Sequence, residues 1–351
     1  MSDISLNIPL EKRRFKAMIG TGGIGAGLLF LLSGNHTLGR EESRGGKYLD
    51  ARDYCKLHII AHYVKVLIGS DFPLFPIGKV GDDDVGRSIF REMEQTGLDM
   101  HYVGYSKGDK TLFGFCFLYP DGTGGNLTTE ESACTKVDPS FIETATPVFS
   151  KYARNFISLS APEVSLAARN KLLELTREHK GFSVASFTSG EMVEAEEKGM
   201  LGMVDLLAIN IDEAGALTRL DAEQNKSLLI VESAIAKMKN FNPAIWLSIT
   251  AGKQGSWSWD GKHLSHGSIF PVEVKSSAGA GDAHIAGIIA GLTAGLTLQQ
   301  AQVLGSLAGA FSVTSQHTIH PDMSRKNLKE LALRSGNEID PFLLKLLDDY
   351  E

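Results

Sequence analysis

Short apolar runs alternate with amphipathic stretches through the second half of this 351-residue chain. The runs with strand character are residues 155–159, 182–187, 204–209 and 245–249. Between them lie helical patterns such as residues 162–180, an amphipathic stretch that ends at Gly181. This alternation predicts an α/β fold with a mostly parallel sheet and helices on both faces, because parallel neighbours need crossover helices. Ligands of such sheets bind at the carboxyl ends of the strands.

The first half of the chain is less regular. A short strand at residues 15–19 runs into the glycine-rich segment 20–25, and residues 64–69 are again strand-like. Residues 111–119 are aromatic and rich in β-formers, and the turn sequence Pro120-Asp121-Gly122-Thr123-Gly124-Gly125 follows them, which predicts a β-hairpin. Because no repeat, low-complexity tract or linker interrupts the chain, we expect residues 1–351 to form a single domain with a small appended element.

The composition excludes several classes of protein. The formal net charge of -7 gives no general attraction to nucleic acid or to an anionic membrane, and no segment is long and apolar enough to span a bilayer. The cysteines, Cys55, Cys116 and Cys134, lack the spacing of a metal or redox motif, which fits a reducing compartment. We therefore expect a soluble cytoplasmic protein that binds neither nucleic acid nor membrane.

The run Ser276-Ser277-Ala278-Gly279-Ala280-Gly281-Asp282 is the most informative motif for function. Residues 270–275 predict a strand before it, and the apolar residues 284–296 predict a buried helix after it. The backbone amides at such a helix start have no partners within the helix and attract an anion. Asp282 then lies beside that anion as a base, which is the arrangement that phosphoryl transfer to a hydroxyl needs. The alternative is a tight turn whose glycines only permit close packing.

Two further clusters follow predicted strands. Asn210 and Glu213 share one face of the first turn of a helix, where their oxygens suit a Mg²⁺ ion held mostly through water, although an ordinary helix cap is the alternative. The segment Thr250-Ala251-Gly252-Lys253-Gln254-Gly255 can place amides and a hydroxyl against nucleotide phosphates, and its alternative is a plain hairpin turn. The run Gly78-Lys79-Val80-Gly81-Asp82-Asp83 indicates a glycine turn that caps a helix.

In order and spacing, these four runs resemble the motifs of the ribokinase family of sugar kinases, the PfkB group. That family has G-K-V-G-D-D, N-x-x-E, T-x-G-x-x-G and D-T-x-G-A-G-D in this order, and the matching residues here are 78–83, 210–213, 250–255 and 276–282. The resemblance spans roughly residues 65–315. It implies a ribokinase-like three-layer α/β sandwich with a mostly parallel central sheet and a small β lid, contributed by about residues 21–45 and 108–130. The chain contains no G-x-x-x-x-G-K-[S/T] motif, so the sequence does not indicate a P-loop kinase.

The resemblance also implies roles for individual residues. Asp282 becomes the catalytic base, and the backbone of Gly279, Ala280 and Gly281 surrounds the transferring phosphoryl group. The residues that bind ATP are then Asn210, Glu213, Thr250, Gly252 and Gly255, and the first two also organise Mg²⁺ through water. The expected activity is ATP-dependent transfer of the γ-phosphoryl group to a hydroxyl of a sugar, nucleoside or polyol.

The acceptor side departs from the family pattern. The family's sugar-binding aspartate follows the first strand, but residues 20–25 contain no acid. The glycine pair of the second sugar-contacting run is Gly45-Gly46, and Asp50 stands where the family has asparagine, so these are the expected acceptor contacts. Ser276-Ser277 replace the leading Asp-Thr, which argues against potassium activation. We expect an unusual acceptor, and a homodimer through the lid is consistent with the sequence.

Two other functions stay open on the sequence alone. Residues 20–25 match the dinucleotide fingerprint G-x-G-x-x-G after a strand, which would suit an NAD-dependent oxidoreductase. Glu41 and Glu42 lie near the distance expected of the ribose-binding acid, but no β-rich run precedes them. The altered acceptor residues would also suit a nucleotide-binding protein on a kinase fold that has no turnover.

Overall fold

The computed structural model describes residues 5–336 and 339–349, and all of their side chains except those of residues 50–52. The strands are β1 (Ala17–Thr21), β2 (Gly25–Leu32), β3 (Gly46–Tyr54), β4 (Leu74–Gly81), β5 (Val103–Ser106), β6 (Leu112–Leu118), β7 (Gly124–Thr128), β8 (Phe156–Ser160), β9 (Phe182–Ala185), β10 (Leu206–Asn210), β11 (Trp246–Thr250), β12 (Ser256–Trp259) and β13 (Leu264–Gly267). The α-helices are α1 (Lys56–Ile68), α2 (Asp84–Gln95), α3 (Pro139–Glu143), α4 (Thr146–Lys151), α5 (Leu166–Glu178), α6 (Met192–Glu197), α7 (Ile211–Thr218), α8 (Ser227–Phe241), α9 (Ala280–Thr293), α10 (Leu298–Ser312), α11 (Arg325–Arg334) and α12 (Pro341–Leu346). The 3-10 helices are η1 (Leu10–Lys12), η2 (Met100–Tyr102), η3 (Ala133–Lys136), η4 (Met200–Met203) and η5 (Gly252–Gln254).

The larger of two sheets is mostly parallel, as the alternating sequence pattern predicts. Within the described residues its strand order is β13-β12-β11-β10-β9-β8-β1-β4-β5. The strands from β11 to β5 in this order pair in parallel, whereas β12 and β13 add an antiparallel edge. Thr21 pairs with Ser160 and Asn210 pairs with Thr250, so these carboxyl ends lie along one edge of the sheet.

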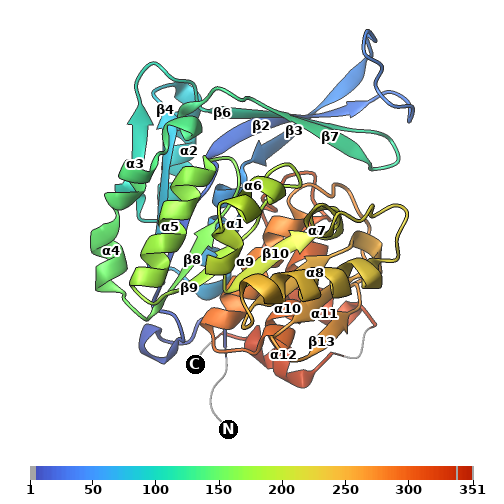
Figure 1. Cartoon of the computed structure of the whole chain (residues 1–351). Coiled ribbons are helices and arrows are strands. Elements are labelled where there is room, and N and C mark those ends of the chain that lie inside the picture. Colours follow the sequence, from blue (N-terminus) through green and yellow to red (C-terminus); the bar gives the residue numbers. More distant parts are fainter. Residues whose placement is uncertain (1–4, 337–338, 350–351) are drawn as a thin grey trace.

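Helices cover both faces of this sheet, because successive side chains of a strand point to opposite faces. Leu206 and Ala208 pack into a core shared with α1, α9 and α10, whereas Leu207 and Ile209 pack with α6, α7 and α8. The helix α9 is buried from Asp282 to Thr293 and lies against both α1 and α10. Figure 1 shows the resulting layers of helix, sheet and helix. Within the described residues, no helix has the length and apolar character that a membrane crossing requires.

A four-stranded sheet in the order β3-β2-β6-β7, here called the lid sheet, projects from this body (Figure 1). β6 and β7 form the predicted hairpin, whose turn contains Gly122 with a φ of 85°. β2, β6 and β7 come from the two segments expected to form a lid. β3 lies outside both segments. The sequence did not predict this strand, because Gly-Lys-Tyr-Leu-Asp-Ala-Arg-Asp-Tyr is polar and lacks the alternation that indicates a strand.

Two predicted strands are wrong for the described part of the chain. Residues 64–69 include the last turn of α1, and so short an apolar stretch around Lys65 does not distinguish a strand from a helix. Residues 270–275 belong to no strand, and Val274 is 55% exposed. Lys275 N donates to Val313 O instead of to a neighbouring strand.

The glycine-rich segment 20–25 leads from β1 directly into β2. A dinucleotide site needs a helix to begin at this point, because the pyrophosphate binds to the amides of the helix N-terminus. The next α-helix begins only at Lys56. The oxidoreductase alternative therefore lacks the structural element that its motif requires.

Candidate active site

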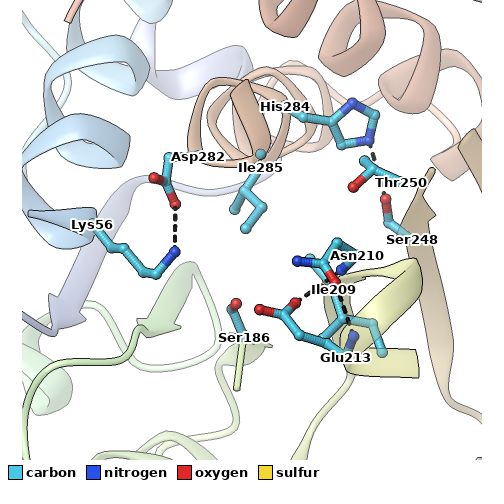
Figure 2. A pocket seen from close by; sticks show the side chains of 12 residues that line it. Lys56, Ser186, Ile209, Asn210, Glu213, Ser248, Thr250, Asp282, His284 and Ile285 are labelled. Carbon is cyan, nitrogen blue, oxygen red and sulfur yellow. Dashed lines mark hydrogen bonds and ion pairs between the residues drawn. The ribbon is translucent and has the colours of Figure 1, made fainter. Parts of the chain in front are cut away.

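A pocket lies at the carboxyl ends of the strands β10 and β11, where α7 and α9 begin (Figure 2). Its lining residues are Lys56, Ser186, Ala208, Ile209, Asn210, Glu213, Ser248, Thr250, Gly281, Asp282, His284 and Ile285. The structure thus brings together predicted site residues that are far apart in the sequence. Parallel strands cause this convergence, because their carboxyl ends share one edge of the sheet.

The start of α9 requires a glycine at its cap. Gly279 has a φ of 79°, a left-handed conformation that side chains rarely adopt, and a Cβ there would lie 2.8 Å from Thr318 O. Ala280 N donates to Ser277 O at 3.3 Å, so this predicted anion-binding amide already has a partner. This turn therefore supports both interpretations of the sequence, a tight turn whose glycines permit close packing and a helix start that binds an anion.

The next two amides, of Gly281 and Asp282, are free to bind a ligand. Ala283 N closes the first helical bond, to Gly279 O at 2.9 Å, which leaves the two preceding amides without helical acceptors. The described part of the chain offers them no other hydrogen bond. A Cβ on Gly281 would meet nothing within 4 Å, so open space adjoins the free amides.

Asp282 is buried and faces an ammonium group. Its side chain is 11% exposed, and Lys56 Nζ lies 3.7 Å from its Oδ1 (Figure 2). Burial raises the pKa of Asp282, and the charge of Lys56 counteracts part of that rise. The charge of Asp282 in turn raises the pKa of Lys56. Lys56 therefore supports an ionised carboxylate in a site that disfavours charge.

Asn210 and Glu213 form a reciprocal cap at the start of α7. Asn210 N donates to Glu213 Oε2 at 2.8 Å, and Glu213 N donates to Asn210 Oδ1 at 2.8 Å. The ordinary helix cap, which the sequence offered as the alternative to a magnesium site, is thus present. Burial raises the pKa of Glu213, and Lys56 opposes this rise.

The capped pair also fits a water-mediated magnesium ion. The carboxylate of Glu213 borders the pocket (Figure 2), and its second oxygen takes no part in the cap. Mg²⁺ in kinase sites keeps several waters and takes one or two carboxylates plus phosphate oxygens. Among the residues that the structure describes, no group of three or more His, Cys, Asp or Glu side chains suits a metal ion. The site therefore suits an ion that arrives with phosphate, not one held by protein ligands alone.

The segment after β11 contributes one side chain to the pocket and otherwise forms a turn. Thr250 lines the pocket beside Asn210. Gly252 and Gly255 have positive φ values of 51° and 83° around η5, where the chain turns into the antiparallel β12. A Cβ on Gly255 would lie 2.2 Å from Gly267 O, so packing alone requires this glycine.

A polar network next to the pocket fixes α9 against the sheet. His284 Nε2 lies 3.2 Å from Ser248 Oγ, which donates to Gln302 Oε1 at 2.8 Å. Burial lowers the pKa of His284 to about 4, so its ring is neutral at pH 7. Sequence analysis missed this network because its members lie on three separate elements, β11, α9 and α10.

The predicted acceptor contacts lie apart from this pocket. Gly46 begins β3 at the outer end of the lid sheet, and Tyr54 ends the strand next to α1. At about 3.3 Å per residue, Gly45 and Gly46 are roughly 25 Å from that inner end. The physical reason is the length of β3, which separates the glycine pair from the helix that follows. The side chain of Asp50 lies outside the described residues.

Two carboxyl groups near Asp282, the buried Asp53 and the half-buried Glu163, escaped sequence analysis. Asp53 accepts a hydrogen bond from Cys116 Sγ at 3.0 Å, and Glu163, in the turn after β8, accepts one from Lys56 N at 3.1 Å. Burial raises the pKa of Asp53 and raises that of Glu163 to about 7. Neither residue, nor Lys56, belongs to a recognisable motif, so only their positions in space reveal them.

We expect Glu163 to make the protein less stable as the pH rises from about 4.5 to about 7. Its pKa is higher in the folded state, at about 7, than the ordinary 4.5, so the folded state binds this proton more tightly and is favoured at the acidic side of the window. The loss amounts to about 3 kcal/mol. Urea unfolding across this window should show a flatter pH dependence for Glu163→Gln, and identical profiles would contradict the assignment.

The fold defines a ribokinase-like α/β protein with a lid. The ribokinase from Giardia lamblia has a similar structure, with a TM-score of 0.77 at 17% identity, covering 90% of this chain and 99% of that one. The ribokinase from Arabidopsis thaliana, solved with ribose and ATP, has a TM-score of 0.70 at 19% identity and covers 90% and 98%. The predicted fold class is thereby confirmed.

The chain belongs to the pfkB family of carbohydrate kinases, whose profile matches residues 61–325. The resemblance that rested on four short motifs is therefore confirmed. Fructoselysine 6-kinase from Shigella flexneri is 40% identical over 65 residues, which are 18% of this chain and 25% of that protein. The 5-dehydro-2-deoxygluconokinase from Geobacillus kaustophilus is 24% identical over 255 residues, 68% of this chain and 73% of that protein. The match to the fructoselysine kinase thus spans about a quarter of that relative's length.

Proposed function

We propose that the protein is an ATP-dependent kinase that transfers the γ-phosphoryl group to a hydroxyl of a sugar, nucleoside or related polyol. One observation carries this proposal: the Asp282 carboxylate, the free amides of Gly281 and Asp282, and the capped Glu213 border a single pocket. Phosphoryl transfer needs a base, donors for the phosphoryl oxygens and a site for magnesium, and few other reactions need this combination. Membership of the pfkB family supports the same conclusion.

In the proposed reaction Asp282 accepts the proton of the acceptor hydroxyl as its oxygen forms the new bond to the γ-phosphorus. The bond from that phosphorus to the ADP oxygen breaks at the same centre. The amides of Gly281 and Asp282 donate to the phosphoryl oxygens, and the dipole of α9 adds to their effect. The open space at Gly281 admits the phosphoryl group.

The donor side of the pocket holds the phosphates of ATP in this proposal. Thr250, Asn210 and Glu213 contact them directly or through water, and the backbone at Gly252 and Gly255 borders the nucleotide. Mg²⁺ bound through water to Glu213 would neutralise phosphate oxygens and align the two reacting groups. The structurally similar ribokinase from Arabidopsis thaliana, solved with ribose and ATP, supports ATP as the phosphoryl donor.

Lys56 is proposed to hold Asp282 in its ionised form. Replacing Lys56 with Met removes the charge that counteracts burial, so the pKa of Asp282 rises and the acid limb of the kcat/KM profile moves to higher pH. We expect about a tenfold lower kcat/KM at neutral pH and partial recovery in alkaline buffer. Lys56→Arg keeps the charge and serves as the control. An acid limb at the same pH in wild type and Lys56→Met would contradict this role.

An ADP-release screen tests the proposed function. Sugars, amino sugars, sugar acids, nucleosides and polyols are offered with ATP and Mg²⁺, and NADH absorbance is followed in parallel reactions that contain NAD. We expect ADP release that depends on one class of acceptor and no change in NADH. ATP binding without ADP release for every acceptor would instead identify a nucleotide-binding protein without turnover.

Three broader expectations stay proposals. We propose that the whole chain is one domain, that the lid sheet mediates a homodimer, and that the protein works in the cytoplasm. The exposed side chains of Leu127 and Tyr48 on the lid sheet support a dimer surface. The thiols of the three cysteines are free and buried, which supports a reducing compartment.

A further inference from the structure

A second cavity lies between α1, α2 and the loop that follows α10. Its volume is about 430 Å³, within the range of small-molecule sites. The residues that line it are Tyr54, His58, His62, Glu92, Gln95, Thr96, His317, Ile319 and Pro321. None of them lines the pocket at Asp282, so this cavity is distinct from the candidate active site.

The wall of this cavity contains a buried imidazole without a hydrogen-bond partner. His58 is 2% exposed, and within the described part of the chain its Nδ1 is buried and unpaired. Buried polar atoms are nearly always hydrogen-bonded, so an unpaired imidazole beside a cavity points to a ligand. Burial lowers the pKa of His58 to about 3, and the nearby His62 adds to this effect. The ring is therefore neutral at pH 7, and one of its nitrogens carries a lone pair.

His62, one turn further along α1, has an acceptor nitrogen as well. Thr96 Oγ1 donates its proton to Glu92 O at 2.9 Å, so His62 Nδ1, which lies 3.3 Å from Thr96 Oγ1, must be the donor in that contact. Burial lowers the pKa of His62 to about 4, so the ring is neutral and its lone pair lies on Nε2. Residues four apart share one face of a helix, and the ring centroids of His58 and His62 are 6.4 Å apart.

The charge of the cavity is negative. Glu92 Oε2 accepts a hydrogen bond from Tyr54 OH at 2.7 Å, which fixes the carboxylate beside the aromatic rings. Among the described residues that line the cavity there is no lysine or arginine. Because His58 and His62 are neutral, the charge of Glu92 is not compensated by them, and the cavity favours a cation.

We propose that this cavity binds a small molecule through a primary ammonium group. The N–H donors of an ammonium match the lone pairs of the two imidazoles and the carboxylate of Glu92. The rings of Tyr54 and His58, with centroids 4.5 Å apart, add aromatic faces that attract a cation. Since no group of three or more His, Cys, Asp or Glu in the described residues suits a metal ion, the occupant is an organic amine. The proposal does not depend on the kinase reaction.

Calorimetric titration of the full chain with 1,4-diaminobutane tests the proposal. The matched probes are 1,4-butanediol, which has no charge, and succinate, which has the opposite charge. We expect the diamine to bind at least about tenfold more tightly than either. Glu92→Gln, which keeps an acceptor for Tyr54, and His62→Phe, which keeps a ring, should each weaken the diamine about tenfold. Glu94→Gln on the exposed side of α2 and Asp282→Asn in the other pocket should leave its affinity unchanged.

A measurement on the wild-type protein decides the matter if a variant fails to fold. The diamine should shift the ring nitrogen NMR resonances of His58 and His62, and leave those of His36, in the exposed loop before β3, unchanged. Absence of these shifts, binding of butanediol or succinate as tight as that of the diamine, or an unchanged affinity in a folded Glu92→Gln would overturn the proposal. A loss of diamine binding in Asp282→Asn would place the amine in the candidate active site and overturn it too.

Discussion

Asp282→Asn is expected to lower kcat by at least about 10²-fold, because an amide cannot take the proton of the attacking hydroxyl. The affinity for ATP should change little, since the free amides and the capped Asn210–Glu213 pair are retained. Asn also preserves the shape of the buried side chain, so the thermal midpoint should stay close to that of wild type. Single-turnover measurements with saturating ATP separate the chemical step from binding.

Asp205→Asn is the matched control for this variant. It removes a second carboxyl group whose pKa burial raises, but Asp205 hydrogen-bonds to Ser183 before β10 and does not border the pocket. We expect Asp205→Asn to alter stability and to leave kcat near the wild-type value. A wild-type kcat in Asp282→Asn would refute its assignment as the base.

Gly281→Val is expected to lower kcat strongly without destabilising the fold. A Cβ at this position would meet nothing within 4 Å, and valine has a slightly higher helix propensity than glycine, so the thermal midpoint should hold or rise slightly. The added methyl groups enter the space beside the free amides, where we place the phosphoryl group. We expect kcat to fall about 10²-fold, the size of effect seen when an oxyanion donor is lost. Steady-state kinetics and calorimetry on the same preparation measure both quantities.

Gly287→Ala, in the same helix, should show the opposite pattern. A Cβ on Gly287 would lie 2.7 Å from Gly305 Cα, so the closely packed α9 and α10 must separate and stability must fall. The folded fraction should keep its kcat, because Gly287 does not line the pocket and lies about one and a half turns beyond Asp282. Full activity in Gly281→Val would place the phosphoryl group elsewhere.

The donor side of the site was predictable because its residues follow strands whose patterns are strong. Asn210 and Thr250 directly follow predicted strands, and the parallel pairing of β10 and β11 places them side by side. The start of α9 was predictable from the small residues before a long apolar run. What failed locally was the short segment 64–69, because a few apolar residues in a row do not distinguish a strand from a helix.

The charged surroundings of Asp282 were not predictable, since Lys56 and Glu163 belong to no common motif. Lys56 begins a helix, and Glu163 lies in a loop more than 100 residues later. Their meeting depends on β1 and β8 being neighbours in the sheet. Gly45 and Gly46 match the family pattern. The structure, however, places this pair at the far end of β3, about nine residues before α1 begins.

The amino-acid sequence by itself determined the α/β class, the family and the phosphate-binding half of the site, because local pattern specifies strands, helix starts and the glycine at position 279. Only the tertiary structure decided which charges surround Asp282. A carboxyl group such as that of Glu163 has no preferred neighbour along the chain, and its partner and its pKa follow from burial and from what the fold places within a few ångströms.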